Sequence, residues 1–142
     1  KNKNERTKMK YTATQWNTEA DKAKFVRQFK AFVESDFAES KFPKWFYTRL
    51  SMTFGHIAHY NQGGFYATFF GNVADKVCFL QQTLRAGCYG SPEFTYCDCE
   101  REIQDWLREQ GTLAKYETAF AAACEASERA TMARLNLKYA MA

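Results

Sequence analysis

The sequence predicts an all-α fold, a single-domain bundle of about five helices over residues 12–142 that follows a flexible basic arm over residues 1–11. A length of 142 residues fits one domain. Two prolines and seven glycines are few, which favours long regular elements. Apolar residues recur at spacings of three and four, and no stretch shows a convincing strand alternation.

The first predicted helix begins at Thr18. The run Thr18–Asp21 resembles a capping box with Asp in place of Glu, because the fourth residue can return a hydrogen bond to the first. The helix then repeats apolar side chains on one face, at Phe25, Phe29, Phe32 and Val33.

Two further helices are predicted on either side of Gly63-Gly64, which breaks the chain. Pro43 suits the first turn of the earlier one. Its apolar stripe is Phe46, Leu50, Phe54 and Ile57. The later helix is expected to run without interruption through Gly71 and to stop at Gly87. Its stripe is Tyr66, Phe70, Val73, Val77, Leu80 and Leu84.

A fourth helix, starting at either Ser91 or Asp98, carries Ile103 and Trp106 and ends at Gly111. Thr112 then begins a long last helix that continues toward Leu137. The alanine-rich run over residues 119–123 would let this helix pack closely against another, so a homodimer is compatible with the sequence.

The net charge of +4 is unevenly distributed. Residues 1–10 hold five basic residues and one acidic residue, so the rest of the chain sums to zero. Residues 22–49 are mainly basic, and residues 93–128 hold nine acidic against three basic residues. We therefore expect a dipolar body with a basic tail, and a general nucleic-acid binder would show a broader basic footprint.

Five cysteines, with no disulfide-dense spacing, indicate free thiols in a reducing cytoplasm. Cys78 and Cys124 lie beside apolar residues on predicted helices and are expected in the core. No apolar run is long enough to span a membrane, and no signal peptide is recognisable. The first residue is not Met, which leaves a removed leader open.

A metal site is a weak candidate. His56 and His59, at spacing i, i+3, could share an ion with Cys97 and Cys99. However, Cys-x-Cys is not the usual zinc-knuckle spacing, and loop cysteines with two helical histidines are the simpler interpretation. No signature of nucleophilic catalysis and no cofactor fingerprint accompanies these residues, so we expect no enzyme and no cofactor.

Nucleic-acid binding is the alternative function that the sequence supports. Basic and aromatic residues alternate at Lys41, Lys44, Trp45 and Arg49, downstream of the basic arm. Such residues can hold phosphates and stack on bases. A helix start with a solvated basic side would give the same pattern.

The acidic residues of the fourth helix are spaced to share one face. This acidic stripe is Asp98, Glu102, Asp105 and Glu109. Most such faces are simply solvated, but this one could dock on a basic partner, such as the nucleic-acid channel of another protein.

The aromatic share of 17% is high, and residues 42–70 are its densest part. If the core cannot bury all these rings, those next to Gly63 would form a binding hot spot. The residues that we predict for this contact are Tyr60, Asn61, Phe65 and Tyr66.

Taken together, these features predict a small, non-catalytic protein that acts by binding another macromolecule, most simply a protein. Size, charge and composition are similar in type to the small inhibitor and regulator proteins of phages and plasmids, anti-CRISPR proteins among them. The similarity rests on no shared motif. A nucleic-acid-binding protein and a His/Cys zinc protein are the alternatives.

Overall fold

The computed structural model describes residues 11–54, 61–85, 87 and 90–140 of the chain, and these ranges contain helices and no strand. The predicted all-α class is therefore confirmed. The elements are α2 (Glu19–Glu34), the short 3-10 helix η1 (Glu39–Lys41), α3 (Lys44–Thr53), α4 (Gln62–Phe69), α5 (Val73–Arg85), α6 (Cys97–Gln110) and α7 (Thr112–Ala140). Residues 1–10 of the predicted arm lie outside the described residues, whereas Tyr11 is buried in the core.

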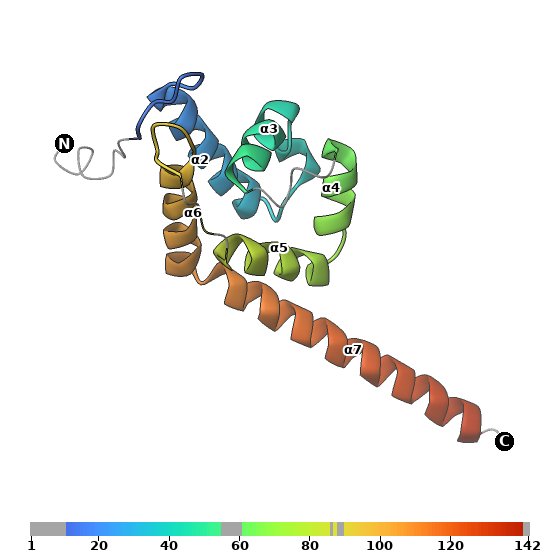
Figure 1. The fold of residues 1–142 in the computed structure, drawn as a ribbon. Coiled ribbons are helices and arrows are strands. Elements are labelled where there is room, and N and C mark those ends of the chain that lie inside the picture. The colour runs from blue at the N-terminus through green and yellow to red at the C-terminus, as the bar shows by residue number, and fades with distance from the viewer. Residues whose placement is uncertain (1–10, 55–60, 86, 88–89, 141–142) are drawn as a thin grey trace.

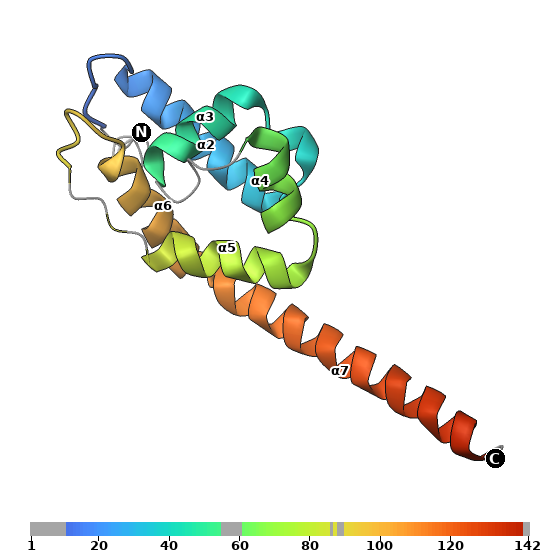
Figure 2. The same cartoon turned by 45° about the vertical axis from the view of Figure 1, so that its right-hand side comes forward.

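Helices α2 to α6 form a body, and α7 projects from it next to α5 and α6 (Figures 1 and 2). Phenylalanine fills the body: every one of the 13 except Phe94 and Phe120 is buried. The rings touch across helices, with centroids 5.0 Å apart for Phe32 and Phe70 and 4.9 Å apart for Phe70 and Phe79. Each buried ring stabilises the fold by roughly 1.5–3 kcal/mol. The core therefore contains most of the phenylalanine rings that make the sequence rich in aromatic residues.

The local signals for helix ends are confirmed at two places. Thr18 is the N-cap of α2, and both hydrogen bonds of the capping box with Asp21 are present. Gly111 ends α6 with φ 62°, the left-handed conformation that glycine adopts without strain. Thr112 then begins α7 as predicted.

The prediction of one helix from Tyr66 to Leu84 is wrong, because the chain breaks into α4 and α5 at Phe70–Asn72. Asn72 starts α5: its side-chain oxygen accepts from the backbone N–H of Asp75 at 2.9 Å. Gly71 thus lies between two helices and not within one. The break lets Phe69 and Phe70 face the core together with Phe79. The start of the fourth predicted helix is Cys97, so Ser91 was the wrong alternative and Asp98 was one residue late.

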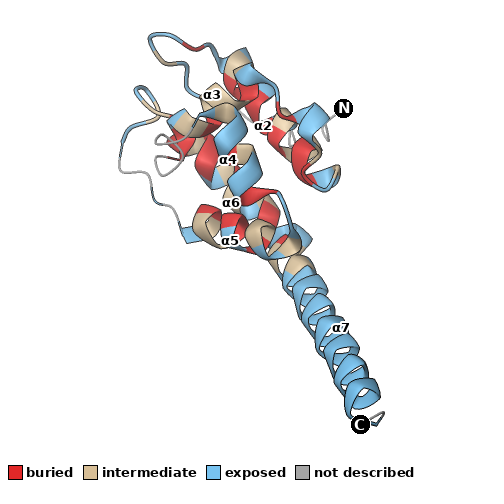
Figure 3. Ribbon diagram, turned by 90° about the vertical axis from the view of Figure 1, so that its right-hand side faces the viewer, coloured by how far each residue is buried: buried red, intermediate tan, exposed pale blue. Residues whose placement is uncertain are grey.

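Only the base of α7 packs on the body. The hydroxyl of Tyr116 donates to the Asp36 carboxylate, which also pairs with Lys76 at 3.2 Å. From Glu117 to Ala140 every residue is exposed (Figure 3). The described chain is therefore a helical body from which α7 projects, and not a plain five-helix bundle. Within the described residues, no helix combines the length and apolarity needed to cross a membrane.

Candidate functional site

Three large apolar side chains among the described residues of the body are exposed, and all three line one cleft. They are Trp16, Met52 and Phe94, with 81%, 51% and 79% of their surface exposed. The cleft has a volume of about 490 Å³ and is lined by Thr14, Trp16, Asn17, Arg49, Met52, Phe94, Thr95 and Tyr96. Exposed apolar groups that gather in this way are unusual on a body whose other large apolar residues, where described, are buried or partly buried.

The segment before α2 holds Trp16 in a tight turn. The hydroxyl of Thr14 accepts from the backbone N–H groups of Trp16 and Asn17, at 3.2 and 2.9 Å. The N–H of Thr14 donates in return to the carbonyl of Asn17 at 2.8 Å. The indole is thus presented to solvent by an ordered backbone.

The loop before α6 holds Phe94 on the other side of the cleft. The carbonyl of Ser91 accepts from the backbone N–H groups of Phe94 and Thr95 and from the Thr95 hydroxyl, each at 2.9 Å. Gly90 permits this turn, since a Cβ there would approach Cγ2 of Thr95 to 2.4 Å.

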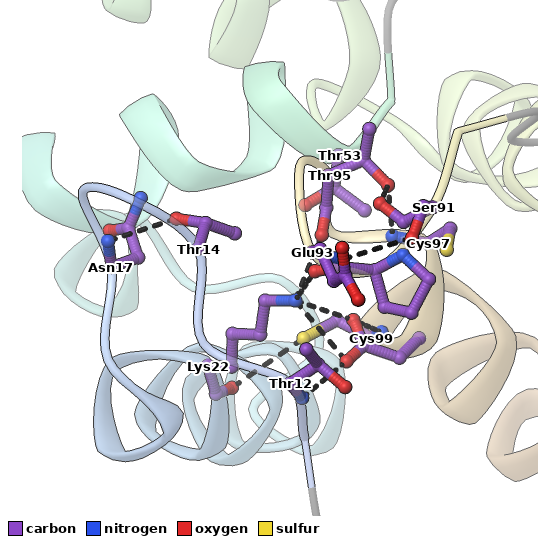
Figure 4. Close-up of polar contacts among 12 residues, drawn as sticks. Thr12, Thr14, Asn17, Lys22, Thr53, Ser91, Glu93, Thr95, Cys97 and Cys99 are labelled. Carbon is purple, nitrogen blue, oxygen red and sulfur yellow. Dashed lines mark hydrogen bonds and ion pairs between the residues drawn. The ribbon is translucent and has the colours of Figure 1, made fainter.

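A buried lysine attaches this loop to the body. The side chain of Lys22 is fully buried, and its ammonium donates to the carbonyls of Pro92 and Thr95 at 2.9 and 2.8 Å and to the Asp98 carboxylate at 3.0 Å (Figure 4). Asp98 also accepts from the backbone N–H of Thr12 at 3.0 Å. The two sides of the cleft are the segment with Trp16 and the loop with Phe94. Lys22 and Asp98 therefore hold both of them against α2 and α6.

The floor of the cleft is polar and carries one cation. Arg49 donates to Oδ1 of Asn17 at 3.0 Å and lies over the Trp45 ring, while its Nε has no hydrogen-bond partner among the described residues. The buried hydroxyl of Tyr96 lacks one there too. Burial raises the pKa of Tyr96, and the nearby Arg49 guanidinium opposes this rise. The other lining residues are uncharged.

The predicted acidic stripe is divided in the structure. Asp98 pairs with Lys22, and Glu102 lies 3.6 Å from Nζ of Lys30, so both face α2. Asp105 and Glu109 are exposed, and Asp105 lies 3.6 Å from Arg108 of its own helix. Two of the four carboxylates therefore pair with lysines of α2, and the other two face solvent.

The predicted aromatic contact is mostly internal. Phe65 is buried in the core, and the hydroxyl of Tyr66 donates to the carbonyl of Phe37 at 2.6 Å. Asn61 is exposed but caps α4, where its side chain accepts from the Gly64 N–H. Tyr60 lies outside the described residues.

The residues of the nucleic-acid alternative fall into two groups. Lys41 and Lys44 are exposed. The Trp45 ring, in contrast, already contacts Lys24 and Arg49, with the cations 4.3 and 4.5 Å from its centroid. These contacts occupy the ring surface that a base would need.

The cysteines differ from the prediction. Cys78 and Cys124 are exposed, which corrects their expected place in the core, and Cys97 and Cys99 are buried at the start of α6. Burial, with the Asp98 charge adding to it, raises the pKa of Cys99 far above its usual range, which disfavours the thiolate that a metal or a nucleophilic reaction needs. The described residues hold no group of three metal-ligating side chains. His56 and His59 lie outside those residues.

Sequence reasoning missed Trp16 and Phe94. Both stand in non-helical segments and belong to no stripe of large apolar residues at helical spacing, which was the available signal that no core face would receive them. Comparison with protein-family models, curated proteins and solved structures found no match to this chain.

Proposed function

We propose that this protein is a small, non-catalytic binding module that docks on another protein and thereby inhibits or regulates it. The observation that carries the proposal is the cleft rimmed by Trp16, Met52 and Phe94. Aromatic residues and Arg dominate the binding energy of protein interfaces, and this cleft combines them on an ordered backbone.

The lining of the cleft indicates the chemistry of the partner. The rim would receive an apolar side chain, since the three exposed groups offer apolar surface on its sides. Arg49 below can donate further hydrogen bonds, because a guanidinium has five N–H donors and its bond to Asn17 uses one of them. A partner segment with an apolar side chain beside a carboxylate or carbonyl oxygen fits this arrangement.

The exposed part of the acidic stripe remains a second contact in this proposal. Asp105 and Glu109 face solvent and could pair with basic groups of the same partner. Asp98 and Glu102 are better explained as supports of the body. Because exposed pairs contribute little affinity, the rim of the cleft is expected to supply most of the binding energy.

A capture experiment with matched variants tests the proposal. The double variant Trp16→Ala with Phe94→Ala removes the rim, and Gln15→Ala with Glu93→Ala removes exposed polar neighbours from the same turns. Tagged proteins are incubated with extract of the source cells, with and without nuclease treatment, and captured proteins are quantified by mass spectrometry. A partner retained by the polar control and weakened about 30-fold by the rim variant supports the proposal, because a hot-spot truncation costs about 2 kcal/mol or more.

Two outcomes would reject it. Equal capture by wild type and rim variant would exclude the cleft. Capture that disappears on nuclease treatment would support the nucleic-acid alternative, and Lys41 and Lys44 would become the residues to change.

A further inference from the structure

The cation in the floor of the cleft is not neutralised by the part of the chain that the structure describes. Arg49 takes part in none of the ion pairs between described residues. Asp21 is near enough for its charge to act on this region, but its carboxylate accepts from the backbone N–H of Thr18 at 2.9 Å. Lys24 adds a second positive charge, since its ammonium lies 4.3 Å from the centroid of the same Trp45 ring that Arg49 covers. The charges therefore favour an anion in the cleft.

A buried hydroxyl beside Arg49 offers a further hydrogen-bond donor. Tyr96 lines the cleft with only 2% of its surface exposed. Neither its hydroxyl nor Nε of Arg49 has a hydrogen-bond partner among the described residues. Buried polar groups in native proteins are normally bonded to a protein atom, to water or to a ligand. These two donors thus point to an acceptor that enters the cleft from outside.

The side-chain acceptors of the lining are already engaged. The hydroxyl of Thr14 accepts from two backbone N–H groups, and the side-chain oxygen of Asn17 accepts from Arg49. The hydroxyl of Thr95 accepts from the backbone N–H of Cys97 at 3.3 Å. A group that only accepts therefore fits this cleft better than one that must donate. A carboxylate is such a group, and its two oxygens match the planar fork of a guanidinium.

We propose that the cleft captures the carboxyl terminus of a partner protein whose last side chain is apolar. Arg49 would hold the terminal carboxylate, and the rim of Trp16, Met52 and Phe94 would receive the side chain. The volume of about 490 Å³ is sufficient for one such residue. This inference rests on the proposed function, which it narrows to one class of partner.

The chemistry of a chain end explains why it suits the cleft better than an internal acidic residue. The last residue carries its carboxylate and its side chain on the same carbon atom, so one group can reach Arg49 while the other contacts the rim. It also brings only one N–H group. An internal segment brings N–H groups on both sides of its acidic residue, and these would need acceptors that the lining side chains already use.

Three short probes test the charge and its position. They are acetyl-glycyl-phenylalanine with a free carboxylate, the same dipeptide with an amidated end, and acetyl-aspartyl-phenylalanine amide, whose carboxylate lies on an internal side chain. NMR titration followed at the indole N–H of Trp16 gives the dissociation constants. We expect wild type to bind the free acid about 10-fold more tightly than either blocked probe, because hydrogen bonds to a charged group are the strong ones.

A matched pair of variants assigns the preference to Arg49. Arg49→Gln is expected to bind the free acid and the amide equally, whereas Arg101→Gln, which removes an exposed cation from α6, should keep the preference. Circular dichroism shows whether each variant keeps its helix content. No binding of the free acid, equal binding of acid and amide by wild type, tighter binding of the aspartyl probe, or a preference that survives Arg49→Gln in the folded variant would each overturn the inference.

These outcomes are distinguishable from failure of the proposed function. Capture by the Trp16→Ala, Phe94→Ala variant is measured separately. If that variant loses a partner while wild type binds acid and amide equally, the cleft contacts a protein but not through a chain end. Capture that does not depend on the rim rejects the proposed function, whatever the probes show.

Discussion

At the scale of single residues, Lys22 and Asp98 determine the shape of the candidate site. The pair joins residues 76 positions apart in the chain, and the lysine is completely buried. Removing one member of a buried pair leaves the other charge without compensation, which costs more than the pair itself contributes. Asp98 is thus a structural residue, although the sequence alone placed it in a docking surface.

The two carboxylates Asp98 and Asp105 should therefore respond differently to truncation. Asp98→Ala is expected to lower the free energy of unfolding by about 3 kcal/mol or more, because it leaves Lys22 buried and unpaired. Asp105→Ala, in an exposed pair with Arg108, should change it by no more than about 0.5 kcal/mol. Urea unfolding of the two variants measures both. Equal losses would contradict the assignment of Asp98 to the body.

For Tyr96, in contrast to Asp98, we expect that removing the polar group does not lower the free energy of unfolding. Its buried hydroxyl has no hydrogen-bond partner among the described residues, so removing it loses no bond. We expect Tyr96→Phe to leave the free energy of unfolding unchanged or to raise it by up to about 1 kcal/mol. Thermal and urea unfolding measure this. A loss above about 1 kcal/mol would mean that the hydroxyl does bond in solution, with Arg49 as the nearest donor.

At the scale of elements, local chemistry explains which helix ends were predictable. The capping box of Thr18 and Asp21 acts within one turn of the chain, and so does the helix end at Gly111. Both were therefore predicted from the sequence. The break before α5 was not, because the apolar spacing from Tyr66 to Leu84 continues through it and hides the cap at Asn72. The cleft was not predictable either, since it depends on two distant segments that Lys22 brings together.

The cap of α5 can be tested alone. Asn72→Ala is expected to lower the free energy of unfolding by about 1 kcal/mol, because the Asp75 N–H loses its acceptor. Asn72→Asp places a carboxylate oxygen where the amide oxygen was and should recover nearly all of this loss. If the alanine variant is as stable as wild type, the break between α4 and α5 is held by the core and not by the cap.

At the scale of the whole molecule, burial of acidic hydroxyl and thiol groups predicts how stability depends on pH. The pKa values of Tyr11, Tyr116 and Cys99 are raised in the fold, mainly by burial. The ordinary values are near 10 for tyrosine and 9 for cysteine. The unfolded chain therefore ionises first as pH rises. The contribution of these groups is complete below about pH 9 and declines above it.

Urea unfolding between pH 8 and pH 11 checks this prediction. The free energy of unfolding should fall progressively above about pH 9, and Tyr116→Phe should make the fall shallower because one raised group is removed. A flat profile over this range would contradict the burial of the three groups.

The molecule as a whole presents two separate surfaces, which are the cleft on the body and the exposed part of helix α7. The body explains why the sequence is so rich in phenylalanine, and the exposed aromatic rings among the described residues lie at these two surfaces. The proposed function requires the rim of the cleft to contact a protein partner.

The most direct measurement of that contact is site-specific photo-crosslinking in the source cells. A photoreactive phenylalanine analogue replaces Phe94 in one protein and the exposed Arg101, on the body away from the cleft lining, in another. We expect a crosslinked protein adduct from position 94 that is absent from position 101. Adducts of equal yield from both positions, or no protein adduct from position 94, would contradict it.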